Sequence, residues 1–302
     1  MKTYNARKFG HLFNPINYKS EFSENIFEHI IQTIKNTEIK KEKFKYLFIK
    51  NFFPENDYLI LLNFLKKIKV FSLKYAELLH DDGTNTYNIS NSYLLKFKDD
   101  FNDEEKKLSI IDEFNECFSD FMINISSILH FTQNILLNIF FDEIKERDSY
   151  LLKYGFLNKK YLKYQTDLFF NIFERRRTDF FISPHLHTAT ELVDCLFYTP
   201  EDETNSFNGT SLYRPNTKVK LHASGFSKYQ DLETDDFENY YSFKYIPNSV
   251  VCWPNVPYSI HGSEYSNSVN NSVEKSYIFF GSKRVFPDQK NSYIFQDNNI
   301  FL

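Results

Sequence analysis

Hydrophobic residues follow two different periods along the chain. In the first half they recur every three or four positions, which is the spacing of one face of an α-helix. From about residue 168 they gather in short runs of four to eight residues separated by turn-forming residues, which is typical of strands. The pattern therefore predicts a helix-rich first half that supports a β-rich second half.

The first half contains three predicted helices and one predicted strand. Isoleucines at helical spacing predict a helix over 23–37, with Ser23 as its cap. A strand over 45–50 leads through a turn at 51–56 to a helix over 57–68, for which Pro54 sets the start. A long apolar stripe predicts helix over most of 102–147, capped by Asn102, with a candidate break at 124–127. Residues 81–86 are predicted to form a loop.

The second half contains a series of predicted strands, over 168–174, 192–198, 210–213, 241–245, 249–253 and 275–280. Many short strands with turn signals between them indicate an antiparallel barrel or sandwich. We expect a single domain over 1–302, with a mainly helical supporting half over 1–165 and the β-rich core over 166–302.

Composition and charge narrow the class of protein. The 302 residues are 42% hydrophobic and 25% charged, with a net charge of −4, as in a soluble globular protein. Nothing suggests the basic face of a nucleic-acid-binding protein, and no apolar run is long enough for a membrane span. We therefore expect neither nucleic acid nor membrane as a partner. Without an apolar leader segment, the expected location is the cytoplasm.

The cysteines do not form a recognisable site. Cys117, Cys195 and Cys252 lie far apart and lack the spacing of a thiolate zinc site. Cys195 and Cys252 fall within apolar runs, so we expect them to be buried as small hydrophobic side chains.

Histidines form the strongest candidate for chemistry. His185 and His187 stand two residues apart, and in an extended segment such side chains point to the same side. Two imidazole nitrogens can then bind one metal ion at roughly 2.0–2.1 Å. His261 follows an apolar strand and precedes Gly262, and is the expected third ligand. Imidazole suits iron, zinc, copper and nickel, so the spacing leaves the metal open. The alternative is that these histidines only satisfy hydrogen bonds in loops.

Several segments resemble the core of the iron(II)/2-oxoglutarate oxygenases. In that family a PHxD segment precedes a strand that ends in an LFYLP-like run, then a Gly-Thr-rich strand, and later a His-Gly pair. The matching segments here are FISPHLH at 181–187, ELVDCLFYTP at 191–200, NGTSLY at 208–213 and SIHG at 259–262. The strand, turn and helix over 46–68 also resemble the start of many of these enzymes, so the resemblance covers about 45–285.

The resemblance implies both a fold and a set of ligands. The fold would be α+β, with a double-stranded β-helix (a jelly roll of the cupin kind) in the C-terminal half and supporting N-terminal helices. Iron(II) would be bound by His185, His187 and His261, with no further catalytic residue. These enzymes couple the oxidative decarboxylation of 2-oxoglutarate by dioxygen to the oxidation of a substrate, here an unidentified small or carrier-held molecule.

The resemblance also suggests residues around the metal. Lys275, followed by Ser276, stands where the family has the basic residue that binds 2-oxoglutarate, and Arg284 is a competing candidate. Asn171, on the strand before the metal motif, is a further candidate cosubstrate contact. The loops at 200–208 and 228–239 are expected to surround the substrate entrance, whose rim we expect to include Tyr198, Tyr213 and Arg214.

One position departs from the family pattern, because His187 stands where the family has aspartate. A neutral imidazole replaces an anionic ligand and raises the charge of the metal centre by one unit. Three interpretations follow: a working three-histidine iron centre, a substitute ligand from Glu191 or Asp194, or a site that has lost its chemistry. The alternative functions are therefore a three-histidine metal enzyme of cupin type that does not use 2-oxoglutarate, and a non-catalytic jelly-roll binding protein.

Overall fold

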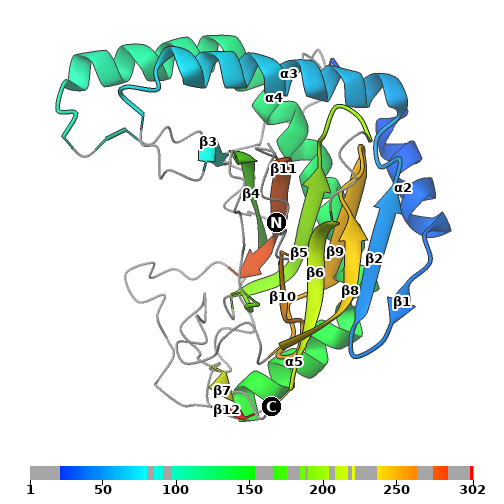
Figure 1. Ribbon diagram of the computed structural model, residues 1–302. Helices are drawn as coiled ribbons and strands as arrows, with labels where there is room; N and C mark the ends of the chain where they lie inside the picture. Colours follow the sequence, from blue (N-terminus) through cyan, green and yellow to red (C-terminus); the bar gives the residue numbers. More distant parts are fainter. Residues whose placement is uncertain are drawn as a thin grey trace.

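The computed structural model has three layers, namely helices, a seven-stranded sheet and a three-stranded sheet (Figure 1). It describes residues 21–79, 85–90, 97–98, 100–153, 166–175, 184–187, 190–203, 208–216, 220–221, 237–263, 275–284 and 300–301. Of the loop at 228–239 that is expected at the substrate entrance, residues 228–236 lie outside the described residues.

The helices are α2 (Ile26–Asn36), α3 (Glu55–Lys74), α4 (Glu104–Ile139) and α5 (Phe141–Lys153). Two predicted caps were wrong. Asn25, not Ser23, is the cap residue of α2, and Ser23 instead donates its backbone N–H to Asp57 Oδ1 at 2.8 Å, which joins the start of α2 to the first turn of α3. Asp103, not Asn102, caps α4, because its Oδ1 accepts from Lys106 N at 2.9 Å.

Helix α4 runs without interruption through the candidate break at 124–127. The hydroxyls of Ser126 and Ser127 donate to the carbonyls four residues earlier, at 2.6 and 3.0 Å, so these polar residues are satisfied within the helix. The helical segment divides at Phe140 instead, between α4 and α5.

The larger sheet has the strand order β1-β2-β9-β5-β11-β4-β3, and every neighbouring pair is antiparallel. Its strands are β1 (Lys40–Lys41), β2 (Lys45–Lys50), β3 (Asn85–Ser90), β4 (Thr166–Arg175), β5 (Glu191–Tyr198), β9 (Ser249–Pro254) and β11 (Lys275–Arg284). Strand β2 has the predicted bounds. Strand β3 includes Asn85 and Thr86, which were predicted as loop, so the helix-rich half also supplies strands to this sheet.

The smaller sheet has the order β10-β6-β8, with β10 at His261–Ser263, β6 at Asn208–Pro215 and β8 at Phe237–Lys244. From β4 onward the chain passes back and forth between the two larger sheets, and the strands of both are antiparallel. This is the double-stranded β-helix, or jelly roll, that the sequence led us to expect. A separate short pair joins β7 (Lys220–Leu221) to β12 (Ile300–Phe301).

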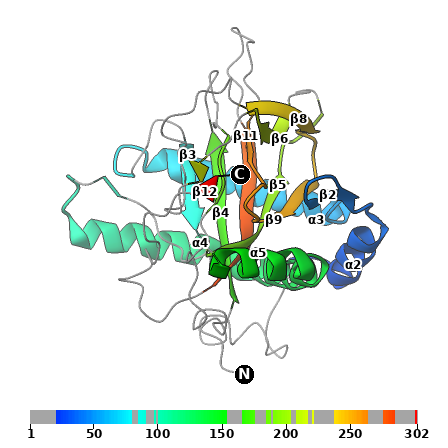
Figure 2. The same ribbon diagram turned by 90° about the horizontal axis from the view of Figure 1, so that it is seen from below.

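The larger sheet separates two hydrophobic cores. Helices α4 and α5 lie on one side of its strands, and β6 and β8 lie on the other (Figure 2). On β5, Cys195 and Phe197 pack toward the helices, while Leu196 and Tyr198 face the space between the sheets. Cys195 lies opposite Cys252 in the register, and both are buried free thiols, as predicted. Among the described residues, no helix is long and apolar enough to cross a membrane.

Candidate metal centre

A backbone bridge brings the first and the last predicted ligand together. His185 N donates to His261 O at 2.9 Å, and His261 N donates to His185 O at 3.1 Å. Residues that exchange both hydrogen bonds in an antiparallel pair lie directly opposite each other, with their side chains on the same face. The bridge therefore connects the His185 segment to β10 and places both imidazoles on one side.

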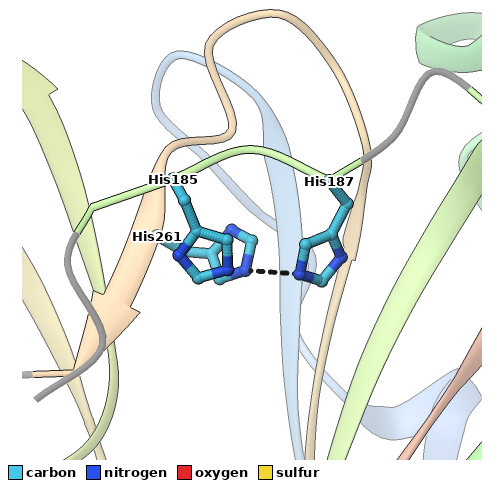
Figure 3. A group of neighbouring side chains, drawn as sticks. All are labelled: His185, His187 and His261. Carbon is cyan, nitrogen blue, oxygen red and sulfur yellow. Dashed lines mark hydrogen bonds between the residues drawn. The ribbon is translucent and has the colours of Figure 1, made fainter. Parts of the chain in front are cut away.

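The ring of His187, two residues after His185, points toward the rings of His185 and His261. His187 and His185 stand two positions apart in a segment without helical structure, and all three rings converge in Figure 3. Ring centroids lie 4.4 Å apart for His185 and His261, 4.6 Å for His187 and His261, and 5.2 Å for His185 and His187. One nitrogen from each of the three histidines lies within 4.8 Å of the others, close enough for one metal ion.

Hydrogen bonds define which nitrogen of His261 faces the centre. Its Nδ1 lies 3.0 Å from the carbonyl oxygen of Ser259. A carbonyl only accepts, so Nδ1 carries the hydrogen and Nε2 keeps a free lone pair. That Nε2 lies 3.2 Å from Nε2 of His187 (Figure 3).

The opposite side of His187 faces two acids. Its Nδ1 lies 3.0 Å from Glu191 Oε2 and 3.0 Å from Asp194 Oδ1. Both carboxylates lie at ion-pair distance, and their negative charge favours a hydrogen on this Nδ1. With that hydrogen on Nδ1, the Nε2 atoms of His187 and His261 face each other at a distance that a proton or a metal ion between them explains. The donor set therefore fits a metal that prefers imidazole.

Burial and charge set the protonation of these groups. Burial lowers the pKa of His261 well below its usual value, and the neighbouring His185 and His187 lower it further. Burial also lowers the pKa of His187, but Asp194 and Glu191 outweigh this effect and raise it to about 10. Burial raises the pKa of Asp194 to about 6 although His187 opposes the shift. Without a metal, the proton between the rings therefore belongs to His187.

Aromatic side chains form walls around the histidines. The Trp253 ring lies 4.6 Å from that of His261, and the Phe279 ring lies 5.1 Å from that of His187. Trp253 is fully buried, and its Nε1 has no hydrogen-bond partner within the described part of the chain. A buried donor of this kind beside the histidines is available to a bound ligand.

A buried ion network supports the start of β5, next to the site. The carbonyl of Glu191 accepts from Arg147 Nη2 at 2.9 Å and from Asn255 Nδ2 at 3.1 Å. Arg147 also donates to Asp148 Oδ1 at 2.9 Å, and Arg284 Nη1 donates to the same oxygen at 2.8 Å. The structure therefore does not bring Arg284 to the histidines: its guanidinium pairs with Asp148 of α5.

The other residues expected to contact the cosubstrate are Asn171 on β4, and Lys275 and Ser276 on β11. Asn171 lies opposite Phe279 in the register of β4 and β11, so it shares the face of the sheet that contacts His187. Lys275 lies at the far end of β11, where its Nζ donates to Asn208 O at 3.2 Å. The Ser276 hydroxyl forms a hydrogen bond with the Thr199 hydroxyl at 2.8 Å.

Two of the residues expected at the substrate rim are buried. Tyr198 is buried between the sheets, at 3% exposure, and Tyr213 is buried at 5% exposure. The Tyr198 hydroxyl donates to Thr210 Oγ1 at 2.8 Å, and the Tyr213 hydroxyl donates to Ser263 O at 2.9 Å, so both rings are fixed parts of the core. Only Arg214 is exposed, and it forms a two-point ion pair with Glu238 at 2.7 and 2.6 Å.

Sequence reasoning named Glu191 and Asp194 only as substitute ligands. The structure places both at Nδ1 of His187, away from His261. The signal in the sequence was one charged residue, Asp194, inside the apolar run LVDCLF. The contributions of Arg147, Trp253 and Phe279 had no local signal, because they depend on how distant elements pack.

Comparisons with known proteins were made at three levels. No protein-family model matches the chain, and a search of curated proteins gives no match. Similar solved structures include a prolyl hydroxylase from Trichoplax adhaerens, in complex with a hypoxia inducible factor peptide, at 9% identity and a TM-score of 0.37, covering 94% of each chain.

Two further similar structures have comparable scores. The Fe(II)/(alpha)ketoglutarate-dependent dioxygenase TqaL is 10% identical, with a TM-score of 0.39, covering 93% of this chain and 98% of its own. IDO from Bacillus thuringiensis is 14% identical, with a TM-score of 0.33, covering 80% of this chain and 93% of its own. The jelly roll itself is defined by the strand order of this chain.

Proposed function

We propose that this protein is a non-haem iron oxygenase that couples 2-oxoglutarate decarboxylation and dioxygen to the oxidation, of hydroxylation type, of a small or carrier-held substrate. The observation that carries the proposal is the convergence of His185, His187 and His261, in which the Nε2 atoms of His187 and His261 lie 3.2 Å apart. A cation between two nitrogen atoms this close, a proton or a metal ion, stabilises the arrangement.

Iron is the metal that best fits both the cluster and the sequence. Imidazole alone would also suit zinc, copper or nickel. The FISPHLH and SIHG segments that carry the ligands resemble those of an iron family, and the jelly roll holds them on facing segments. Three protein ligands would leave coordination positions open for a cosubstrate and dioxygen.

The chain's own residues bind and shield the reacting groups. An iron ion here would supply the redox chemistry that dioxygen requires. His185, His187 and His261 would hold it, and the rings of Trp253 and Phe279 exclude water from its surroundings. The Trp253 N–H is the buried donor available to an oxygen atom of a bound cosubstrate or substrate.

Lys275 is the proposed partner of the distal carboxylate of 2-oxoglutarate. It is four residues from Phe279 on β11, which corresponds to about 13 Å along the strand. Its flexible four-carbon stem can cover part of that distance, and its ammonium group would act as a point charge rather than as a two-point arginine fork.

One observation favours a second candidate, a three-histidine metal enzyme that does not use 2-oxoglutarate. Between His187 and Lys275, the inter-sheet face of β11 carries Tyr277 and Phe279, and the Tyr277 ring is buried. Tyr198 fills the space beside them and is held by Thr210. This aromatic packing must open for 2-oxoglutarate to reach from the metal to Lys275.

Anaerobic reconstitution with iron(II), followed by titration with 2-oxoglutarate, tests the proposal. We expect a visible charge-transfer band in the wild type that disappears in His185→Ala and His261→Ala. Lys275→Ala should weaken 2-oxoglutarate binding at least tenfold, while Lys283→Ala, an exposed lysine on the same strand, should leave it unchanged. Bound metal without a band would favour the second candidate. No band and no bound metal would leave only a non-catalytic jelly roll.

A further inference from the structure

We infer that Asp194 and Glu191 are positioning residues of the metal centre. Their carboxylates fix the Nδ1–H tautomer of His187, and they place the negative charge of the site beside a metal ligand rather than on the metal. The inference rests on the proposed function for the metal itself. It concerns what makes His187, which stands in place of an acid, a usable ligand.

The geometry of His187 assigns a separate role to each nitrogen. Nε2 faces His261 at 3.2 Å, toward the other two imidazoles. Nδ1 faces Asp194 and Glu191, each at 3.0 Å. A metal-bound imidazole commonly donates its second N–H to a carboxylate, which fixes the tautomer and makes the ligand more basic. His187 has two such acceptors.

Asp194 lies beside His187 in a buried position, and its charge also acts on the buried Arg147. It is 0% exposed in an otherwise apolar stretch of β5, where burial of an ionised carboxylate is unfavourable unless a positive group compensates it. Its side chain lies on the inter-sheet face, and its nearest ionic partner is His187. A carboxylate in this position is well placed to stabilise positive charge at the histidine cluster.

The backbone around both acids is built to hold them in place. Glu191 begins β5, and its carbonyl is fixed by Arg147 and Asn255. Asp194 pairs in register with Gly281 of β11. A Cβ at position 281 would lie 2.1 Å from Val193 O, so glycine permits the close approach of β5 and β11 beside Asp194.

The two carboxylates supply negative charge that the three histidine ligands lack. With aspartate as a ligand, the family centre has one anionic group on the metal. Here all three ligands are neutral, so a divalent ion would keep its full charge in a buried site. Asp194 and Glu191 act on that charge through His187, without occupying a coordination position.

Metal titration of conservative variants tests the inference. Co(II) and Zn(II) serve as probes, and their affinities are measured for wild type, Asp194→Asn, Glu191→Gln and the control Glu201→Gln, an exposed acid in the loop after β5. Removal of such a supporting partner typically lowers metal affinity 10–100-fold. We expect that loss in Asp194→Asn, a smaller loss in Glu191→Gln, and none in Glu201→Gln.

Nitrogen-15 NMR of the Zn(II)-loaded protein supplies a readout that a merely structural role would not move. The wild type should show a proton on His187 Nδ1 at a strongly downfield position, and this resonance should move upfield in both variants. Thermal unfolding of the metal-free variants shows whether each has folded. If Asp194→Asn does not fold, Glu191→Gln, whose side chain is 18% exposed, decides the question.

The outcomes separate this inference from the proposed function. A wild type that binds no metal would overturn the proposed function, and the inference with it. A wild type that binds metal, together with variants of unchanged affinity and unchanged His187 Nδ1 resonance, would overturn the inference alone. Loss of affinity with the shifted resonance would support it.

Discussion

At the residue scale, Asn248 joins two turns that are distant in sequence. Its φ of 53° lies in the left-handed region, which asparagine tolerates better than most residues. Its Oδ1 accepts from Phe53 N at 2.8 Å and its Nδ2 donates to Phe53 O at 2.8 Å, so the side chain completes the backbone bonding of the turn after β2. The site depends on this clamp indirectly, because Asn248 immediately precedes β9, which carries Trp253.

Asn248→Ala should lower the free energy of unfolding by about 3 kcal/mol, from two lost buried hydrogen bonds and the strained φ of alanine. Asn51→Ala is the matched control: Asn51 has a φ of 51° but is exposed, so we expect a loss of about 1 kcal/mol. Urea denaturation monitored by circular dichroism measures both. Equal losses in the two variants would show that the clamp contributes nothing.

Gly281 is the second residue on which the site depends. Its Cβ position would lie 2.1 Å from Val193 O, and a backbone atom within a sheet cannot move aside as a flexible side chain can. We expect Gly281→Ala to destabilise the fold by about 3 kcal/mol and to weaken metal binding, because β5 and β11 must separate beside Asp194. Chemical denaturation and Co(II) titration check the two effects. A variant with wild-type values in both assays would contradict the close approach.

The sequence allowed the histidines to be identified, but not their surroundings. His185 and His187 were found from their spacing, and His261 from its place after a strand. The positions of Asp194 and Glu191 relative to the two nitrogens of His187 could not be predicted, because they depend on the register of β5 against a segment without regular structure. For the same reason, the burial of Tyr198 and Tyr213 could not be predicted.

At the element scale, α5 is connected to the sheet by buried charges. Asp148 receives hydrogen bonds from Arg147 of the same helix and from Arg284 of β11, and both arginines are buried. Arg147 also fixes the carbonyl of Glu191. The helix therefore supports the strand that begins beside the metal centre.

Asp148→Asn should destabilise the protein by about 3 kcal/mol, because it leaves two buried guanidinium groups without their anion. The exposed pair of Arg214 and Glu238 provides the control, and Glu238→Gln should leave the denaturation midpoint unchanged. Guanidinium chloride is unsuitable here, since its ions screen charge, so urea is the denaturant of choice. If the two variants behave alike, the network does not stabilise the attachment of α5.

The positions of strands with a clear run of apolar residues were predicted well from the sequence. Elements without such a run were missed. Strand β2 and most of β5 and β9 follow from apolar runs. Strand β3, with the polar sequence NTYNIS, forms through its pairing with β4 and has no such signal. The continuity of α4 was missed because its mid-helix serines bond within the helix rather than ending it.

At the scale of the whole molecule, the helices and the smaller sheet occupy opposite faces of the larger sheet. Helices α2, α3 and α4 pack on one face, while the histidines lie toward the other face, where the two sheets meet. The sequence predicted a mainly helical half that supports a β-rich half, but the contribution of β1, β2 and β3 to the larger sheet required knowledge of the tertiary pairing.

The central claim is that one metal ion is bound between His185, His187 and His261. An anomalous difference map, recorded at the iron edge from crystals reconstituted with iron(II) under anaerobic conditions, tests it most directly. The account predicts a single peak at about 2.1 Å from one nitrogen of each imidazole, with Asp194 and Glu191 remaining on the far side of His187. A peak between His187 and the two carboxylates, or no peak at the histidines, would contradict it.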